Sequence, residues 1–207
     1  MENVITIAEL KQFIETNRSK LNRDSTLLMT KGDSFGFIKH QSYLNLTGFY
    51  DWVLENGEKI EGGYGDALAI WVEPNAGKIV FGEVAKDVAR THEDFFRNFM
   101  FDGYESVPRN LQRFEQELNR MTENEDAIVT GLLDDHTENP FGLIESVKIV
   151  EPDNVKLLYK DSYGHEKEKS PKYPMLILKM GESFTQEIKP KANESYKHIK
   201  KYNDFKS

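Results

Sequence analysis

The chain has 207 residues, of which 38% are hydrophobic and 30% are charged, and its formal net charge is -8. The 13 Phe, 9 Tyr and 2 Trp provide enough large apolar side chains for a packed core, which excludes a disordered chain. The absence of cysteine excludes disulfide bonds, thiolate catalysis and cysteine-based zinc sites. No apolar run approaches the roughly 18 residues of a membrane span, and the N-terminus lacks a signal-peptide pattern. We therefore expect a cytoplasmic protein that does not bind membranes.

The negative charge is unevenly distributed along the chain. Residues 189–207 carry six lysines and two acidic residues, a local charge of +4, which leaves -12 for residues 1–188. No cation lies between Arg120 and Lys148, whereas seven acidic residues do. A body of this sign repels phosphate backbones, so we expect a basic protein as partner and no direct binding of nucleic acid. The alternative is that the acidic surface serves only solubility.

Helices are predicted mainly in the first two thirds of the chain. Thr6, followed three residues later by Glu9, matches a capping box, and an apolar stripe continues it as a helix to about Asn22. The spacing of Leu46, Tyr50, Val53 and Leu54 predicts a second helix over Ser42–Glu55. Two further helices are predicted from Val88 to about Gly103 and from Ser106–Pro108 to Met121. We expect these last two helices to pack on a central hairpin.

That hairpin and the remaining strands follow from period-two patterns and turn residues. Ala67–Val72 and Lys78–Val84 are predicted to pair through a connection over residues 73–77. Residues 160–173 form a long charged segment that we expect to be a mobile loop. Other strands are predicted at Thr26–Thr30, Phe35–Ile38, Ile128–Leu133, Leu143–Val150, Val155–Tyr159, Met175–Lys179 and Phe184–Ile188.

These elements predict an α+β fold with a mixed or antiparallel sheet and helices packed on one face. Four helices are expected in the N-terminal two thirds, followed by a strand-rich C-terminal part. We expect one domain over residues 1–188, with a subdivision near residues 123–140 as the alternative. Residues 189–207 are expected to form a basic, flexible tail.

Two clusters suggest ligands but have simpler explanations. Gly62-Gly63-Tyr64-Gly65 resembles a phosphate loop, but a strand is predicted to follow it where a dinucleotide or P-loop motif requires a helix. Asp134-Asp135-His136 with Glu138 is dense in metal-binding atoms, but adjacent loop residues point in different directions. We interpret the first as a turn and the second as a solvated acidic turn, and expect neither a metal nor a cofactor.

The main enzymatic alternative is a metal-dependent nuclease of the PD-(D/E)XK type. Such enzymes place one acid on a strand and an acid and a lysine two residues apart on the next strand, so that all three face one metal-bound water. Asp66, Glu83 and Lys86 are the candidate catalytic residues. Glu83 and Lys86 are three residues apart, which places them on opposite faces of a strand unless a bulge intervenes.

Residues 62–101 resemble the later half of SMI1/KNR4-type (SUKH) domains. The matching segments are Gly65-Asp66-Ala67-Leu68-Ala69-Ile70-Trp71, Val80-Phe81 and Asp87-Val88-Ala89-Arg90-Thr91-His92-Glu93-Asp94-Phe95-Phe96. The resemblance implies an α+β fold and a binding role, commonly that of an immunity protein that neutralises a toxin nuclease or similar effector. An acidic body would complement the cationic cleft of such a toxin.

The sequence therefore predicts a non-enzymatic inhibitor or immunity-type protein that neutralises a toxin or a nucleic-acid enzyme through an acidic surface. A phage or mobile-element protein, either structural or directed against host defence, remains an alternative beside the nuclease. The candidate partner-binding acids are Asp66, Glu73, Asp134, Asp135 and Glu138. Tyr64 and Trp71 are candidate aromatic anchors, although Trp71 is also a natural core residue.

Overall fold

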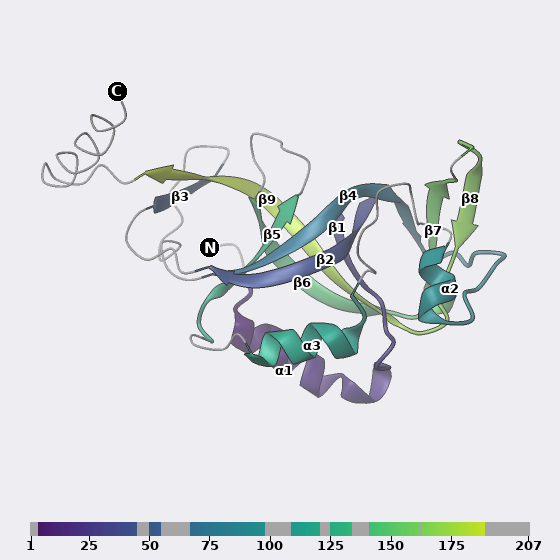
Figure 1. Cartoon of the computed structure of the whole chain (residues 1–207), viewed down its shortest axis with the longest axis horizontal. Helices are drawn as coiled ribbons and strands as arrows, with labels where there is room; N and C mark the ends of the chain where they lie inside the picture. The colour runs from purple at the N-terminus through teal and green to yellow at the C-terminus, as the bar shows by residue number, and fades with distance from the viewer. Residues whose placement is uncertain are drawn as a thin grey trace, which may run out of the picture.

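The computed structural model describes residues 4–44, 50–54, 67–97, 109–120, 125–133, 141–161 and 163–188. The backbone alone is described for residues 44, 50–54, 73–75, 97, 132–133, 141 and 182–188. Strands dominate these ranges and join in one mixed sheet, with helices packed below and at one end of it (Figure 1).

Helix α1 (Ile7–Thr16) begins at the predicted capping box. Thr6 Oγ1 accepts a hydrogen bond from the backbone N–H of Glu9 at 3.2 Å, and Glu9 Oε2 accepts one from the N–H of Thr6 at 2.8 Å. The helix ends before the predicted Asn22, because the side-chain amide of Asn17 donates to the carbonyl of Phe13 at 2.9 Å and a 3-10 turn, η1 (Arg18–Lys20), follows. The start of the helix was confirmed and its end was misplaced.

Two further α-helices lie within the described residues. Helix α3 (Leu111–Arg120) buries Leu111, Phe114 and Leu118, the spacing that its sequence predicted. Helix α2 (His92–Arg97) starts later than predicted, because Val88 forms a bridge with Ser170 and stays outside the helix. No helix within these ranges is long enough and apolar enough to cross a bilayer.

Within the described residues, nine strands form the sheet, and a second 3-10 turn, η2 (Pro152–Asn154), precedes the seventh. The strands are β1 (Leu27–Lys31), β2 (Ser34–Leu44), β3 (Tyr50–Leu54), β4 (Ala67–Phe81), β5 (Ile128–Leu133), β6 (Phe141–Val150), β7 (Val155–Lys160), β8 (Glu166–Lys169) and β9 (Met175–Ile188).

Six of these strands close into a ring. Their order is β2–β1–β9–β6–β5–β4, and β4 pairs back onto β2 from Lys78 opposite Ser34 to Ala67 opposite Leu44. The β1–β9 and β4–β5 pairs are parallel and the others are antiparallel. Outside the ring, β3 pairs with β9, and β7 and β8 continue the sheet from the C-terminal part of β4.

Two apolar cores lie on the two sides of the ring strands. The inner core takes side chains from all six ring strands together with α1 and α3, which lie side by side beneath the sheet (Figure 1). The outer core lies at the β7 end and includes Phe95 and Phe96 of α2. Successive side chains of β1 point into the two cores in turn: Leu27 and Met29 join the inner core, and Leu28 joins the outer one. This alternation is the period of two that a strand buried on both faces requires.

The predicted fold class was wrong, because strands outweigh helices in the described residues. The predicted helix over Ser42–Glu55 is not formed: Ser42 belongs to β2, and Tyr50–Leu54 is strand β3. A short segment with aromatic and β-branched residues, such as Tyr50-Asp-Trp-Val-Leu, fits helix and strand spacing equally well. Pairing with β9 from Tyr50 opposite Ile188 to Leu54 opposite Phe184 decides in favour of the strand.

The predicted central hairpin is also wrong, because Ala67–Phe81 is a single strand, β4. Its first part pairs with β5 and its last part with β7, while β2 runs along both parts. The turn-forming residues 73–77 therefore lie in an irregular stretch of one long strand. Glycine and proline are also found at β-bulges within strands. The register shift between Phe35 and Phe37 of β2 lies opposite this passage.

Two C-terminal predictions were also wrong. Met175–Lys179 and Phe184–Ile188 belong to one strand, β9, which continues through Gly181. The predicted loop over residues 160–173 contains β8, which pairs with β7 as a hairpin. Asp161 closes the connection, since its Oδ1 accepts hydrogen bonds from the N–H groups of Tyr163 and His165 at 2.9 Å.

Position 77 requires a glycine because β7 pairs with β4 beside it. A Cβ atom at this position would overlap the carbonyl oxygen of Leu158 and would lie 3.1 Å from Cε1 of Phe35. Because the first of these atoms belongs to backbone, it cannot rotate away.

We expect Gly77→Ala to lower the free energy of unfolding by about 3 kcal/mol or more, because the added methyl group overpacks the β4–β7 contact. Gly164→Ala is the matched control: Gly164 also has a positive φ, 81°, but its Cβ would meet nothing within 4 Å. That variant is expected to lose about 1 kcal/mol from backbone strain alone. Urea unfolding measures both, and equal losses would contradict the close approach of the two strands.

Candidate functional site

Most of the predicted partner-binding residues lie outside the described residues. Tyr64, Asp66, Asp134, Asp135 and Glu138 belong to this group. Glu73 lies in β4 opposite Phe37, with its backbone alone described. Trp71 is therefore the predicted anchor whose side chain can be placed.

Trp71 lies on the outer side of the ring. Its neighbours in β4, Ile70 and Val72, both join the inner core, so the alternation of the strand directs the indole outward. The ring of His40, the residue opposite it in β2, stacks on the indole with 4.5 Å between ring centroids and 11° between planes. His40 is exposed and Trp71 is half-buried, so the pair forms part of the surface. The sequence analysis proposed Trp71 as an anchor and did not single out His40, because only the β2–β4 register brings the two rings together.

The β5 register places Trp71 near the end of the described part of β5. Trp71 pairs with Leu132, and β5 ends at Leu133, the residue before the acidic segment 134–140.

The two most acidic undescribed segments are attached to the sheet at neighbouring positions. Residues 55–66 follow Leu54 and residues 134–140 precede Phe141. Leu54 and Phe141 both pair with Phe184, one from each side of β9. With a strand separation of about 4.8 Å, their backbones lie about 10 Å apart.

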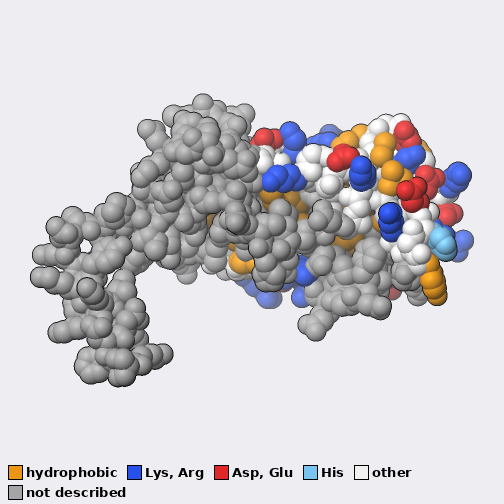
Figure 2. All heavy atoms as spheres, turned by 90° about the horizontal axis from the view of Figure 1, so that it is seen from above, with side chains coloured by type: hydrophobic (Ala, Val, Ile, Leu, Met, Phe, Trp, Pro, Cys, Tyr) orange, Lys and Arg blue, Asp and Glu red, His pale blue; other side chains and the backbone are white. Residues whose placement is uncertain are grey.

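The described residues together carry almost no net charge. They include 22 of the 35 acidic residues and 20 of the 27 lysines and arginines. Figure 2 shows both signs interspersed over the end of the molecule formed by β7, β8 and α2. The acidic excess therefore belongs to the remaining segments before residue 189, which hold 11 acidic residues and a single lysine.

Ion pairs neutralise many of the described carboxylates. Lys156 bonds Glu83 and lies 3.6 Å from Glu168, and the Glu83 carboxylate raises the pKa of Lys156. Arg109, which is almost fully buried, pairs with Glu117 on α3. Burial nevertheless lowers the pKa of the Arg109 guanidinium, despite the opposing effect of Glu117.

Of the three candidate nuclease residues, Asp66 lies outside the described residues, and Glu83 and Lys86 follow the end of β4. Glu83 is paired with Lys156, and the backbone N–H of Lys86 donates to Glu168 at 3.2 Å. Within the described ranges, no group of three or more His, Asp or Glu side chains is placed to hold a metal ion.

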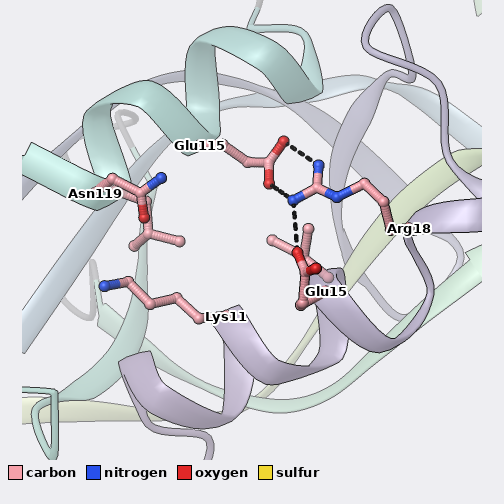
Figure 3. A pocket seen from close by; sticks show the side chains of 7 residues that line it. Lys11, Glu15, Arg18, Glu115 and Asn119 are labelled. Atoms are coloured by element: carbon pink, nitrogen blue, oxygen red, sulfur yellow. Dashed lines mark hydrogen bonds and ion pairs between the residues drawn. The ribbon is translucent and has the colours of Figure 1, made fainter.

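A pocket of about 160 Å³ lies between α1 and α3. Figure 3 shows Arg18, Glu15 and Glu115 on one side of it and Lys11 and Asn119 on the other. Arg18 binds Glu115 with two hydrogen bonds, one of them 2.7 Å long, and Glu15 with one of 3.2 Å. The hydrogen-bonded Glu115 carboxylate raises the pKa of Arg18 above its usual value. Lys11 pairs with Glu125 at 2.9 Å, so the charges here already serve to link α1, α3 and the start of β5.

Comparisons with protein-family models, with curated proteins and with solved structures give no match for this chain. The resemblance of residues 62–101 to SMI1/KNR4-type domains stays a prediction.

We expect the Arg18–Glu115 pair to contribute about 0.5–1 kcal/mol to stability, because its geometry is bidentate and Glu115 is largely covered. A double-mutant cycle with Arg18→Ala and Glu115→Ala measures this coupling in urea unfolding. The matched cycle with Glu15→Ala is expected to give a smaller value, because Glu15 is 77% exposed and makes one bond. A larger coupling to Glu15 than to Glu115 would contradict this assignment.

Proposed function

We propose that the chain is a non-enzymatic binding protein of the inhibitor or immunity type. Its partner is a basic protein, such as a toxin or a nucleic-acid enzyme. The acidic segments 55–66 and 134–140 form the contact surface, with Asp66, Asp134, Asp135 and Glu138 as the principal charges and Glu73 in the adjoining strand. Tyr64 and Trp71 act as aromatic anchors beside them.

The observation that carries this proposal is the pairing of Leu54 and Phe141 with the same residue of β9, Phe184. Residues 55–66 have a net charge of -3, and so do residues 134–140. Their attachment points are about 10 Å apart, which is comparable to the Debye length of roughly 8–10 Å at physiological ionic strength. The two charged segments therefore act on an approaching partner as one source of negative potential.

The near-neutral scaffold supports the same conclusion. A uniformly acidic surface would attract any cation weakly and from all sides. Because acids and bases are nearly balanced over the described surface, the negative potential is strongest at the part of the molecule to which the acidic segments are attached. Such a directed field accelerates association with a complementary partner and fixes its orientation.

The proposal is tested by removing charge from one acidic segment and, separately, from the scaffold. The triple variant Asp134→Asn/Asp135→Asn/Glu138→Gln and the control Glu151→Gln/Asp153→Asn/Glu166→Gln each remove three negative charges. All three control residues are exposed on the described surface. We expect the first variant to bind immobilised poly-L-lysine about tenfold more weakly at low salt and the control to lose less than about threefold.

Equal weakening in the two variants would mean that net charge alone governs binding, and it would overturn the proposal. A magnesium-dependent nuclease assay distinguishes the enzymatic alternative. DNA cleavage that is abolished by Glu83→Ala would favour the nuclease in place of the inhibitor.

A further inference from the structure

Two buried polar atoms between β2 and α3 have no hydrogen-bond partner within the described part of the chain. Gln41 is 4% exposed, and its side-chain N–H donates to the carbonyl of Phe114 at 3.0 Å, but its Oε1 accepts no hydrogen bond. Arg109 is 7% exposed, and its Nη1 donates to Glu117, but its Nε donates to no protein atom. Because an unsatisfied polar atom in the interior has lost its hydration without replacement, nearly all such atoms in native proteins are paired.

A β-bulge brings Gln41 to the face of β2 that α3 covers. The register of β2 against β4 shifts by one residue between Ile38 and His40, so Lys39 is an extra residue in β2. In an unbroken strand Ile38 and Gln41, three residues apart, would face opposite sides. The extra residue reverses the alternation, so Ile38 joins the inner core and Gln41 also points to α3. The backbone of β2 therefore forces a polar side chain into a buried position.

Arg109, two residues before α3, lies against the same parts of β2 and α3 as Gln41. Its backbone N–H donates to the carbonyl of Ile38 at 3.1 Å, and its guanidinium group binds Glu117. Phe114 and Glu117, the α3 partners of the two side chains, are three residues apart and therefore neighbours on the helix surface. Both unsatisfied atoms thus belong to side chains held between one stretch of β2 and one turn of α3.

We propose that the protein binds one water molecule internally, between Gln41 Oε1 and Arg109 Nε. The site presents one acceptor and one donor, so its ligand has to donate and accept hydrogen bonds at the same time. The amide oxygen disfavours an anion, and the guanidinium group disfavours a metal ion. Water meets both requirements, and it is the ligand small enough for two side chains that are almost fully enclosed. This inference is independent of the proposed function.

The water completes a chain of hydrogen bonds that starts and ends on α3. Gln41 donates to the carbonyl of Phe114, the water donates to Gln41 and accepts from Arg109, and Arg109 donates to Glu117. Gln41 belongs to β2, so this chain ties the helix to the sheet by directional contacts. The apolar contacts of α3 with the inner core are not directional, and the hydrogen-bonded chain therefore fixes the rotation of the helix on the ring.

Solution NMR tests the site in the unmodified chain, so the result does not depend on whether a variant folds. We expect the Arg109 Nε–H and the Gln41 side-chain amide protons to show rotating-frame Overhauser peaks to water, opposite in sign to the diagonal. That sign distinguishes a long-lived neighbouring water from proton exchange with solvent. The Nε–H of Arg18 is the control, because its side chain is 48% exposed and only exchange peaks are expected there. Exchange peaks alone at Arg109 and Gln41, or no peaks, overturn the inference.

A double-mutant cycle tests the link between the two side chains. Gln41→Met removes the acceptor, and Arg109→Lys removes the Nε donor but keeps a positive charge beside Glu117. If one water joins them, the combined change in the unfolding equilibrium constant differs from the product of the single changes by about threefold or more. Gln41→Met with Lys156→Met, on β7 outside the ring, is the control and is expected to be multiplicative within about twofold. Multiplicative behaviour of the first pair overturns the inference.

Discussion

The pairing of β2 with β4 is the interaction on which the rest of the structure depends. It closes the ring, and only a closed ring lets side chains from six strands share an interior with α1 and α3. It also requires β4 to stay extended through residues 73–77, since β2 runs beside both of its parts. Removing one free edge from a sheet of this size protects backbone groups that would otherwise pair with other chains. One edge strand outside the ring, β8, alternates Glu and Lys, which disfavours such pairing by charge.

The same constraint determines the course of β4. A hairpin at residues 73–77 would have brought the start and the end of this segment together, whereas in the continuous β4 they lie at opposite ends of one 15-residue strand. The pairing that keeps β4 extended is also the one that stacks His40 on Trp71. The failure of the predicted hairpin and the stacking of these two rings therefore have one structural cause.

Features set by neighbouring residues were predictable from the sequence, whereas features set by distant pairing were not. The capping box of Thr6 and Glu9 and the stripe of Leu111, Phe114 and Leu118 involve contacts within one helix, and both were confirmed. Ile128–Leu133 was correct to the residue because its β-rich pattern has no helical alternative. The helix predicted through Tyr50–Leu54 was wrong because this spacing suits either structure and the paired residues of β9 lie 130 to 138 residues further along the chain. The position of His40 depends on register, for which a single sequence contains no signal, and the acids of residues 134–140 lie outside the described residues.

The charges of the described scaffold are largely balanced by ion pairs within it. The described scaffold has almost as many bases as acids and uses them in pairs such as Arg18 with Glu115 and Lys156 with Glu83. Exposed pairs of this kind add little energy each, but they cancel the scaffold's charge at short range. The acidic excess of residues 1–188 lies in the segments outside the described residues, such as 55–66 and 134–140. Under the proposed function, the charge that attracts the partner and the ion pairs that stabilise the described sheet therefore belong to different residues, and the first can change without loss of the second.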